Sequence, residues 1–218
     1  MMKRLLFSGL GQVIVLLVCI QLARALVAYA LRFVAQPDGN VVLFQISNAL
    51  SFILVGVAML ILRRPSLTTL GLDFNSGGRR EKAIYVFGGF AVLTLIAISL
   101  MLDVHENLVN LHFAIVVPLF EELLFRGYVW SKIKSVLPEN ANGSTLIIVT
   151  LLFAFWHIGY LDSFLSIPLA VHGITLPFLL MSKIIIGLVL GTIAGFARWQ
   201  SGKVFGPVLI HALWNLFA

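Results

Sequence analysis

The feature that most constrains this chain is a series of long apolar runs separated by short polar connections. Of its 218 residues, 60% are hydrophobic and 11% are charged, and the mean hydropathy is +1.04. One soluble core cannot bury so much apolar surface, so lipid must solvate the runs. Runs of about 20 apolar residues are long enough for helices that cross a bilayer. The expected fold is therefore an all-α, polytopic transmembrane helical bundle.

About seven spans are expected, with six or eight as alternatives, because two stretches are ambiguous. The N-terminal run, 5–23, is interpreted as an uncleaved span rather than a signal peptide. It continues to residue 35 as a tilted or interfacial segment that carries Arg24 and Arg32. The stretch 161–176 is interpreted as partly buried or re-entrant, because charged and turn-forming residues interrupt it. The other spans are expected at about 42–62, 83–102, 111–130, 144–160, 177–197 and 204–218, the last being short for a bilayer.

The distribution of charge predicts the orientation of the chain. If the spans alternate, nearly all Lys and Arg residues fall in connections on one side, which the positive-inside rule makes cytoplasmic. The N-terminus is then cytoplasmic, and a multi-pass protein of the plasma (inner) membrane is expected. The same rule accounts for the net charge of +6, so the lipid bilayer is the expected partner and nucleic acid is excluded. Cys19 is the only cysteine, so no intramolecular disulfide can form.

Three ionisable residues lie close together inside the fourth expected span. Each costs about 2.5 to 3.5 kcal/mol at bilayer depth on insertion scales, so the cluster requires an explanation. On a helix Glu122 and Arg126 are four residues apart and can pair, whereas Glu121 points about 100° away. Glu121 is therefore the candidate catalytic carboxylate, and Glu122 and Arg126 are expected to support it.

Polar residues in the fifth and seventh spans complete a possible catalytic set. His157 follows Phe153 by one helical turn, and His211 and Asn215 share one face of the seventh span. Each residue alone is compatible with ordinary interhelical hydrogen bonding. Together with Glu121 they provide the groups that activate water and stabilise an oxyanion. Glu121 would accept the proton of water and His157 would orient or share that water, while His211 and Asn215 would donate to the oxyanion.

In order and spacing, these motifs resemble those of the CPBP family of intramembrane proteases. This family, the CAAX prenyl protease and bacteriocin-processing (Abi) proteins, includes the type II CAAX prenyl endopeptidases. The resemblance covers 111–218, expected to be a catalytic core that follows N-terminal transmembrane helices in 1–110. It implies an endopeptidase acting on a membrane-associated peptide or protein, lipidated or not. The matching positions are Glu121-Glu122-x-x-x-Arg126-Gly127, Phe153-x-x-x-His157 and His211-x-x-x-Asn215.

Alternatives remain for the cofactor and for the function. No metal is favoured, but Glu121, His157 and His211 offer a set of ligands that binds catalytic zinc. The chain has no His-Glu-x-x-His helix. A non-catalytic membrane scaffold or bacteriocin-immunity protein is an alternative to the protease, although a scaffold has no need to keep Glu121 free. A transporter is less favoured, because the two halves show no matched broken helices.

The remaining polar and aromatic residues are assigned no catalytic role. Lys183 lies near the end of its span, where its ammonium group can snorkel to the interface. Three histidines lie at or near polar connections, and the tryptophans fit interfacial belts or helix packing. These residues are His105, His112, His172, Trp130, Trp156, Trp199 and Trp214.

Overall fold

The structure is a computed structural model that describes residues 2–35, 40–74, 78–102, 111–164 and 175–217. Across these residues the secondary structure is helical and contains no strand, which confirms the all-α class. Five helical stretches among them are long and apolar enough to cross a membrane, which confirms the polytopic bundle. The elements are α1 (Met2–Ala35), α2 (Val41–Arg63), α3 (Leu67–Leu70), α4 (Arg79–Leu102), η1 (His112–Val116), α6 (Val117–Glu122), η2 (Leu123–Val129), α7 (Trp130–Lys134), α8 (Asn142–Trp156), η3 (His157–Tyr160), α9 (Leu161–Phe164), α10 (Leu176–Ser201) and α11 (Phe205–Phe217).

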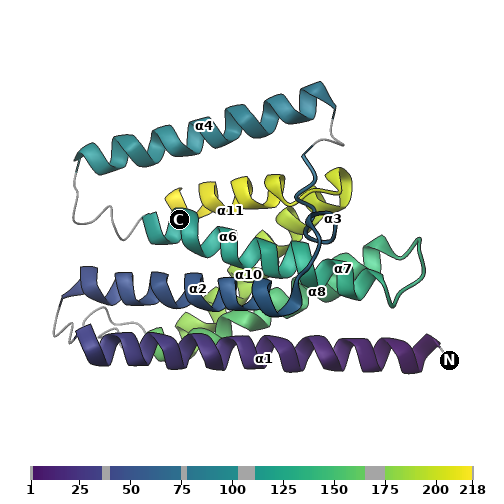
Figure 1. Cartoon of the computed structure of the whole chain (residues 1–218), viewed down its shortest axis with the longest axis horizontal. Coiled ribbons are helices and arrows are strands. Elements are labelled where there is room, and N and C mark those ends of the chain that lie inside the picture. The colour runs from purple at the N-terminus through teal and green to yellow at the C-terminus, as the bar shows by residue number, and fades with distance from the viewer. Residues whose placement is uncertain (1, 36–39, 75–77, 103–110, 165–174, 218) are drawn as a thin grey trace.

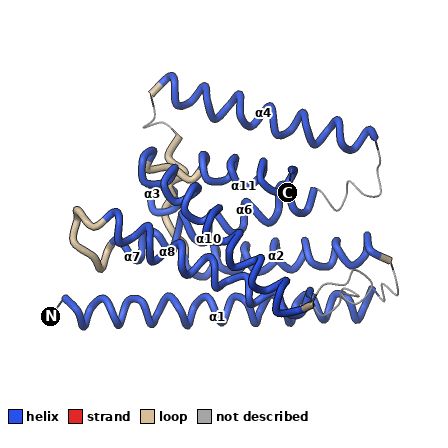
Figure 2. Tube along the Cα trace, turned by 180° about the vertical axis from the view of Figure 1, so that it is seen from behind, coloured by secondary structure: helices blue, strands red, loops and turns tan. Residues whose placement is uncertain are grey.

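The helices lie in rough layers, with α1 and α2 side by side at one edge and α4 at the opposite edge (Figure 1, Figure 2). Helix α4 packs on α11, and α11 packs in turn on α6 and α10. The N-terminal ends of α1 and α4 and the C-terminal ends of α2 and α7 lie at one end of the bundle. Basic residues lie at the N-terminal end of α4 and at the C-terminal ends of α2 and α7. Which compartment this end faces stays a prediction, as does the division of the chain at residue 110.

The fourth expected span is one helical path from η1 to α7, but it is not a regular α-helix. Two stretches, η1 and η2, have the wider π-helical turn and flank the α-helical turns of α6. Pro118 in the first turn of α6 has no N–H to donate to the carbonyl of Ala114, which favours a wider turn there. Such turns occur frequently at functional sites. The candidate carboxylates, Glu121 and Glu122, lie at the end of α6, directly before the second π stretch.

Helices α8 and α10 approach closely because α10 has three glycines spaced four residues apart, Gly187, Gly191 and Gly195. A Cβ atom on Gly187 would lie 2.9 Å from the Cα of Ala154, and one on Gly191 would lie 3.1 Å from Cγ2 of Thr150. Small residues at this spacing let membrane helices pack backbone to backbone. The close packing holds the C-terminal end of α8, and His157 directly after it, against α10.

The N-terminal helix differs from the expectation of an interfacial extension. Helix α1 runs unbroken to residue 35, and Arg24 is fully buried within the bundle. Its guanidinium lies 2.5 Å from Asp162 on α9, and Arg32 lies 3.1 Å from the same carboxylate. The expected extension to residue 35 is therefore present, but Arg24 lies inside the bundle, where it pairs with a carboxylate 138 residues later in the chain. The rest of the stretch expected to be re-entrant, 165–174, lies outside the described residues.

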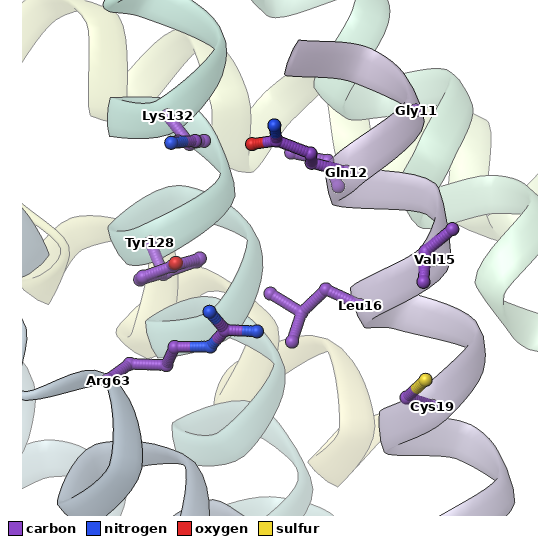
Figure 3. Close-up of a pocket in the computed structure, with 9 residues that line it drawn as sticks. Gly11, Gln12, Val15, Leu16, Cys19, Arg63, Tyr128 and Lys132 are labelled. Atoms are coloured by element: carbon purple, nitrogen blue, oxygen red, sulfur yellow. The ribbon is translucent and has the colours of Figure 1, made fainter. Parts of the chain in front are cut away.

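A hollow of about 540 Å³ opens between α1 and the helical path of η2 and α7. Figure 3 shows Arg63, Tyr128 and Lys132 on one side of it and Gln12 of α1 on the other. None of the candidate catalytic residues lines this hollow. The candidate catalytic residues therefore lie elsewhere in the bundle.

Candidate active site

The candidate catalytic residues meet in a pocket of about 170 Å³ between α2, the fourth span, η3 and α11. Glu121 comes from the end of α6 and is 1% exposed, so its carboxylate does not face lipid. His157 begins the 3₁₀ turn η3 directly after α8. His211 is buried on α11, and Asn215 lies one turn later on the same helix. The four residues expected to act together thus line one cavity.

One oxygen of the Glu121 carboxylate accepts hydrogen bonds, and the other has no hydrogen-bond partner. Its Oε1 accepts hydrogen bonds from the Tyr160 hydroxyl and, at 3.0 Å, from the indole Nε1 of Trp156. Its Oε2 has no hydrogen-bond partner and lies 3.8 Å from Nε2 of His211. The expectation that Glu121 is wholly free was therefore wrong for Oε1. The unoccupied Oε2 is the atom available for chemistry.

Trp156 and Tyr160 are contacts of Glu121 that the sequence interpretation missed. Trp156 was expected in an interfacial belt or in helix packing, but its indole is buried and bonds the carboxylate. The two residues are four apart across the end of α8, so their side chains share a face and are 2.6 Å apart. The four-residue spacing of Trp156 and Tyr160, which flank His157, is the sequence signal that could have indicated these two residues.

The expected ion pair between Glu122 and Arg126 is present, fully buried, with Nη1 and Oε1 3.0 Å apart. The guanidinium also donates to the carbonyl of Gly191 on α10 at 3.0 Å and lies 4.2 Å from the centroid of the Phe153 ring. Glu122 has a further contact, because its Oε1 lies 2.9 Å from Nδ1 of His211. The pair therefore links the fourth span to α8, α10 and α11.

His157 is oriented by a hydrogen bond within its own helix. Its Nδ1 lies 2.9 Å from the carbonyl oxygen of Phe153. Because a carbonyl only accepts, Nδ1 carries the hydrogen, and in the neutral ring Nε2 is left as an acceptor. The Phe153 ring lies edge-on to both imidazoles, with centroids 5.0 Å from His157 and 5.9 Å from His211. This packing holds the two histidines on either side of one aromatic ring.

The amide of Asn215 is partly engaged, since its Nδ2 donates to the carbonyl of Phe113 at 2.7 Å. One N–H of that amide remains for another acceptor. His112 and Lys183, to which no role was assigned, also line the pocket. His112 is buried rather than lying in a polar connection. His105 and His172 lie outside the described residues.

The possible zinc ligands do not form a complete set. Glu121 Oε2 and His211 Nε2 are 3.8 Å apart, a distance at which both atoms could bind one zinc ion. Catalytic zinc sites have three protein ligands. Among the residues that the structure describes, no group of three or more His, Cys, Asp or Glu side chains could hold a metal ion. Whether the protein uses a metal therefore stays a prediction.

The four candidate catalytic residues lie within the part of the chain that matches a known family. Residues 103–217, more than half of the chain, match the family described as type II CAAX prenyl endopeptidase Rce1-like. No curated protein and no solved structure matches the chain. The family match agrees with the resemblance of the motifs and with the bundle of apolar helices. The chain therefore belongs to the type II CAAX prenyl endopeptidase Rce1-like family, and it is an integral membrane protein of the CAAX protease class.

Proposed function

We propose that this protein hydrolyses a peptide bond of a membrane-associated substrate with water activated by Glu121. The observation that carries the proposal is the unpartnered Oε2 of a carboxylate that is almost fully buried. A buried acceptor of this kind costs free energy unless something hydrogen-bonds to it. A water molecule in the pocket would do so, and a general base needs that contact with the proton it removes.

Trp156 and Tyr160 are proposed as positioning residues for the base. Both donate to Oε1 of Glu121, and neither is bonded to Oε2. With one oxygen fixed, the carboxylate cannot rotate freely, so Oε2 keeps facing the pocket. Holding a catalytic group in one geometry removes part of the entropic cost of reaching the transition state.

His157 is proposed to orient the attacking water. Its Nδ1 hydrogen is engaged by the carbonyl of Phe153, so Nε2 of the neutral ring can accept a hydrogen bond. The water would donate one hydrogen to Glu121 and the other to His157. Its oxygen lone pair would then be free to attack the carbonyl carbon of the substrate.

His211 and Asn215 are proposed to bind the oxyanion that forms on the substrate. Because Nδ1 of His211 lies against Glu122, the ring can donate from Nε2 only as an imidazolium. The proposal therefore requires the protonated ring, which would lie beside the carboxylates of Glu121 and Glu122. Each oxyanion donor in comparable sites contributes about 3 to 4 kcal/mol.

The proposed hydrolysis balances with these groups alone. Glu121 takes a proton from water as the water oxygen bonds to the scissile carbonyl carbon. The carbonyl oxygen becomes an oxyanion held by His211 and Asn215. The carbon–nitrogen bond then breaks while Glu121 returns the proton to the departing amine, which restores the carboxylate. The products are a new carboxyl end and a new amino end.

The test of this function uses the purified protein in lipid nanodiscs with two probes. One is a peptide with a farnesylated C-terminal CAAX sequence, and the other is the same peptide without the farnesyl group. Mass spectrometry in H₂¹⁸O should detect cleavage of one or both, with one ¹⁸O atom in each new carboxyl group. A scaffold or a transporter would cleave neither peptide. That result, together with unchanged peptide ends in membranes of cells with wild-type protein and with Glu121→Gln, would contradict the proposal.

Metal removal is expected to leave the activity unchanged. Among the described residues, no three His, Cys, Asp or Glu side chains are placed to bind one zinc ion. The proposed steps use only side chains and water. The measurement is the rate of cleavage after dialysis against EDTA and 1,10-phenanthroline, with metal content determined by mass spectrometry. Loss of activity that added zinc restores would show that a metal takes part and would overturn this prediction.

Tyr160→Phe is expected to lower kcat about tenfold and to leave KM unchanged. The substitution removes one donor to Oε1 of Glu121 but keeps the ring, and hydrogen bonds to charged groups contribute about 1.5 to 3 kcal/mol. Tyr29→Phe is the matched control, because the Tyr29 side chain is exposed on α1. A variant that loses thermal stability but keeps its kcat would show that the Tyr160 hydroxyl is only structural.

A further inference from the structure

Three other polar side chains that line the pocket have atoms without hydrogen-bond partners. They are Oδ1 of Asn48, Oε1 of Gln45 and Nδ1 of His112. Asn48 and His112 are 4% and 5% exposed, and all three residues line the same pocket as Glu121. The proposed hydrolysis uses none of them.

Such atoms are unusual, because a buried polar group left unpaired costs stability. Other polar groups of α2 avoid this cost within their own helix. The Ser47 hydroxyl donates to the carbonyl of Leu43, and the Ser51 hydroxyl donates to that of Asn48. The amides of Gln45 and Asn48 could only be satisfied by something that enters the pocket. Each unpaired buried group in a native structure needs an explanation, and a functional role is one of them.

The chemistry of these atoms indicates the ligand. The two amide oxygens accept hydrogen bonds, and a neutral imidazole nitrogen without hydrogen accepts as well. An anion would be repelled by such acceptors, whereas a peptide backbone presents N–H donors at regular intervals. The rest of the lining nearby is apolar and aromatic, including Phe52 and Val117. This combination of apolar walls and a few acceptors suits an extended peptide segment.

We propose that Asn48, together with Gln45 and His112, forms a subsite that accepts hydrogen bonds from the backbone N–H groups of the substrate. The inference rests on the proposed function, which places the substrate peptide in this pocket. The peptide would lie between α2 and the carboxylate of Glu121. Asn48 and Gln45 lie outside residues 103–217, the part that matches the family. The N-terminal helices therefore contribute directly to substrate binding rather than only to the bundle.

The test compares wild-type protein with Asn48→Leu, which has a similar shape but no acceptor. The probes are the peptide cleaved in the assay above and a series in which one backbone N–H at a time, other than at the scissile bond, is replaced by an ester oxygen. For wild-type protein, one ester should lower kcat/KM about tenfold, the effect of losing one buried hydrogen bond. Asn48→Leu should lower kcat/KM for the parent peptide about tenfold through KM, and that ester should then cause no further loss.

Two further measurements keep this inference separate from the proposed function. Binding of the parent peptide is measured in Glu121→Gln protein with and without Asn48→Leu, so that cleavage is not required. The dissociation constant should rise about tenfold with Asn48→Leu. Thermal unfolding should show Asn48→Leu to be at least as stable as wild-type protein, because an unpaired buried group has been removed. Ser47→Ala is the matched control, since its hydroxyl is buried on the same helix but bonds within it.

The outcomes are distinct. If Glu121→Gln abolishes cleavage but Asn48→Leu changes neither KM nor binding, the proposed function stands and this subsite is wrong. If the ester causes the same loss in both proteins, Asn48 does not contact that N–H group, and the subsite is also wrong. If Asn48→Leu lowers the melting temperature, the amide is part of the packing and the inference is overturned. Loss of binding together with retained stability supports it.

Discussion

Glu121→Gln is expected to lower kcat by about 1000-fold while leaving the fold intact. An amide cannot take up the proton of water, and a positioned general base contributes about 10²- to 10⁴-fold. The carbonyl oxygen of glutamine can still accept the hydrogen bonds that Trp156 and Tyr160 donate to Oε1. The measurements are kcat for the cleaved peptide in nanodiscs and the melting temperature of both proteins.

Two further substitutions show whether the effect belongs to this carboxylate. Glu139→Gln removes an exposed carboxylate in the connection before α8 and should leave kcat unchanged. Glu121→Asp keeps the charge but withdraws it from Trp156 and Tyr160, so its kcat should lie between those of Glu121→Gln and wild-type protein. A Glu121→Gln protein that cleaves at the wild-type rate would remove Glu121 from the mechanism. A variant that only unfolds would show a lower melting temperature as well.

The helical class and the pairing of Glu122 with Arg126 could be predicted because both depend on short stretches of sequence. The length of an apolar run decides whether a helix can cross a bilayer. Residues four apart on a helix lie on one face, and the pair meets as that rule predicts. The π turns of the same span do not disturb this contact. The three motifs that resemble those of the family also contain residue pairs spaced four apart on a helix.

Contacts between distant parts of the chain could not be predicted in this way. The bond from Trp156 to Glu121 depends on how α8 packs against α6, and the burial of Arg24 depends on Asp162. Nothing in the spacing of either pair reveals the contact, because it depends on how separate helices pack against one another. Asn48 was overlooked for the same reason, since a single amide in an apolar run is compatible with many environments.

Arg126→Met is expected to lower the free energy of unfolding by about 3 to 5 kcal/mol, the cost of leaving one partner of a buried ion pair without the other. The guanidinium is fully buried, and its loss also removes the hydrogen bond to Gly191 and the contact with Phe153. Arg63→Met is the matched control, because Arg63 is exposed at the end of α2. The measurement is equilibrium unfolding in a mixed lipid and detergent system.

The double variant Glu122→Gln/Arg126→Met should recover most of the lost stability. It removes one negative and one positive charge together, so no buried charge is left without a partner. The glutamine oxygen can still accept a hydrogen bond from Nδ1 of His211. A double variant no more stable than Arg126→Met would mean that the guanidinium stabilises the bundle through α10 and Phe153 rather than by neutralising Glu122.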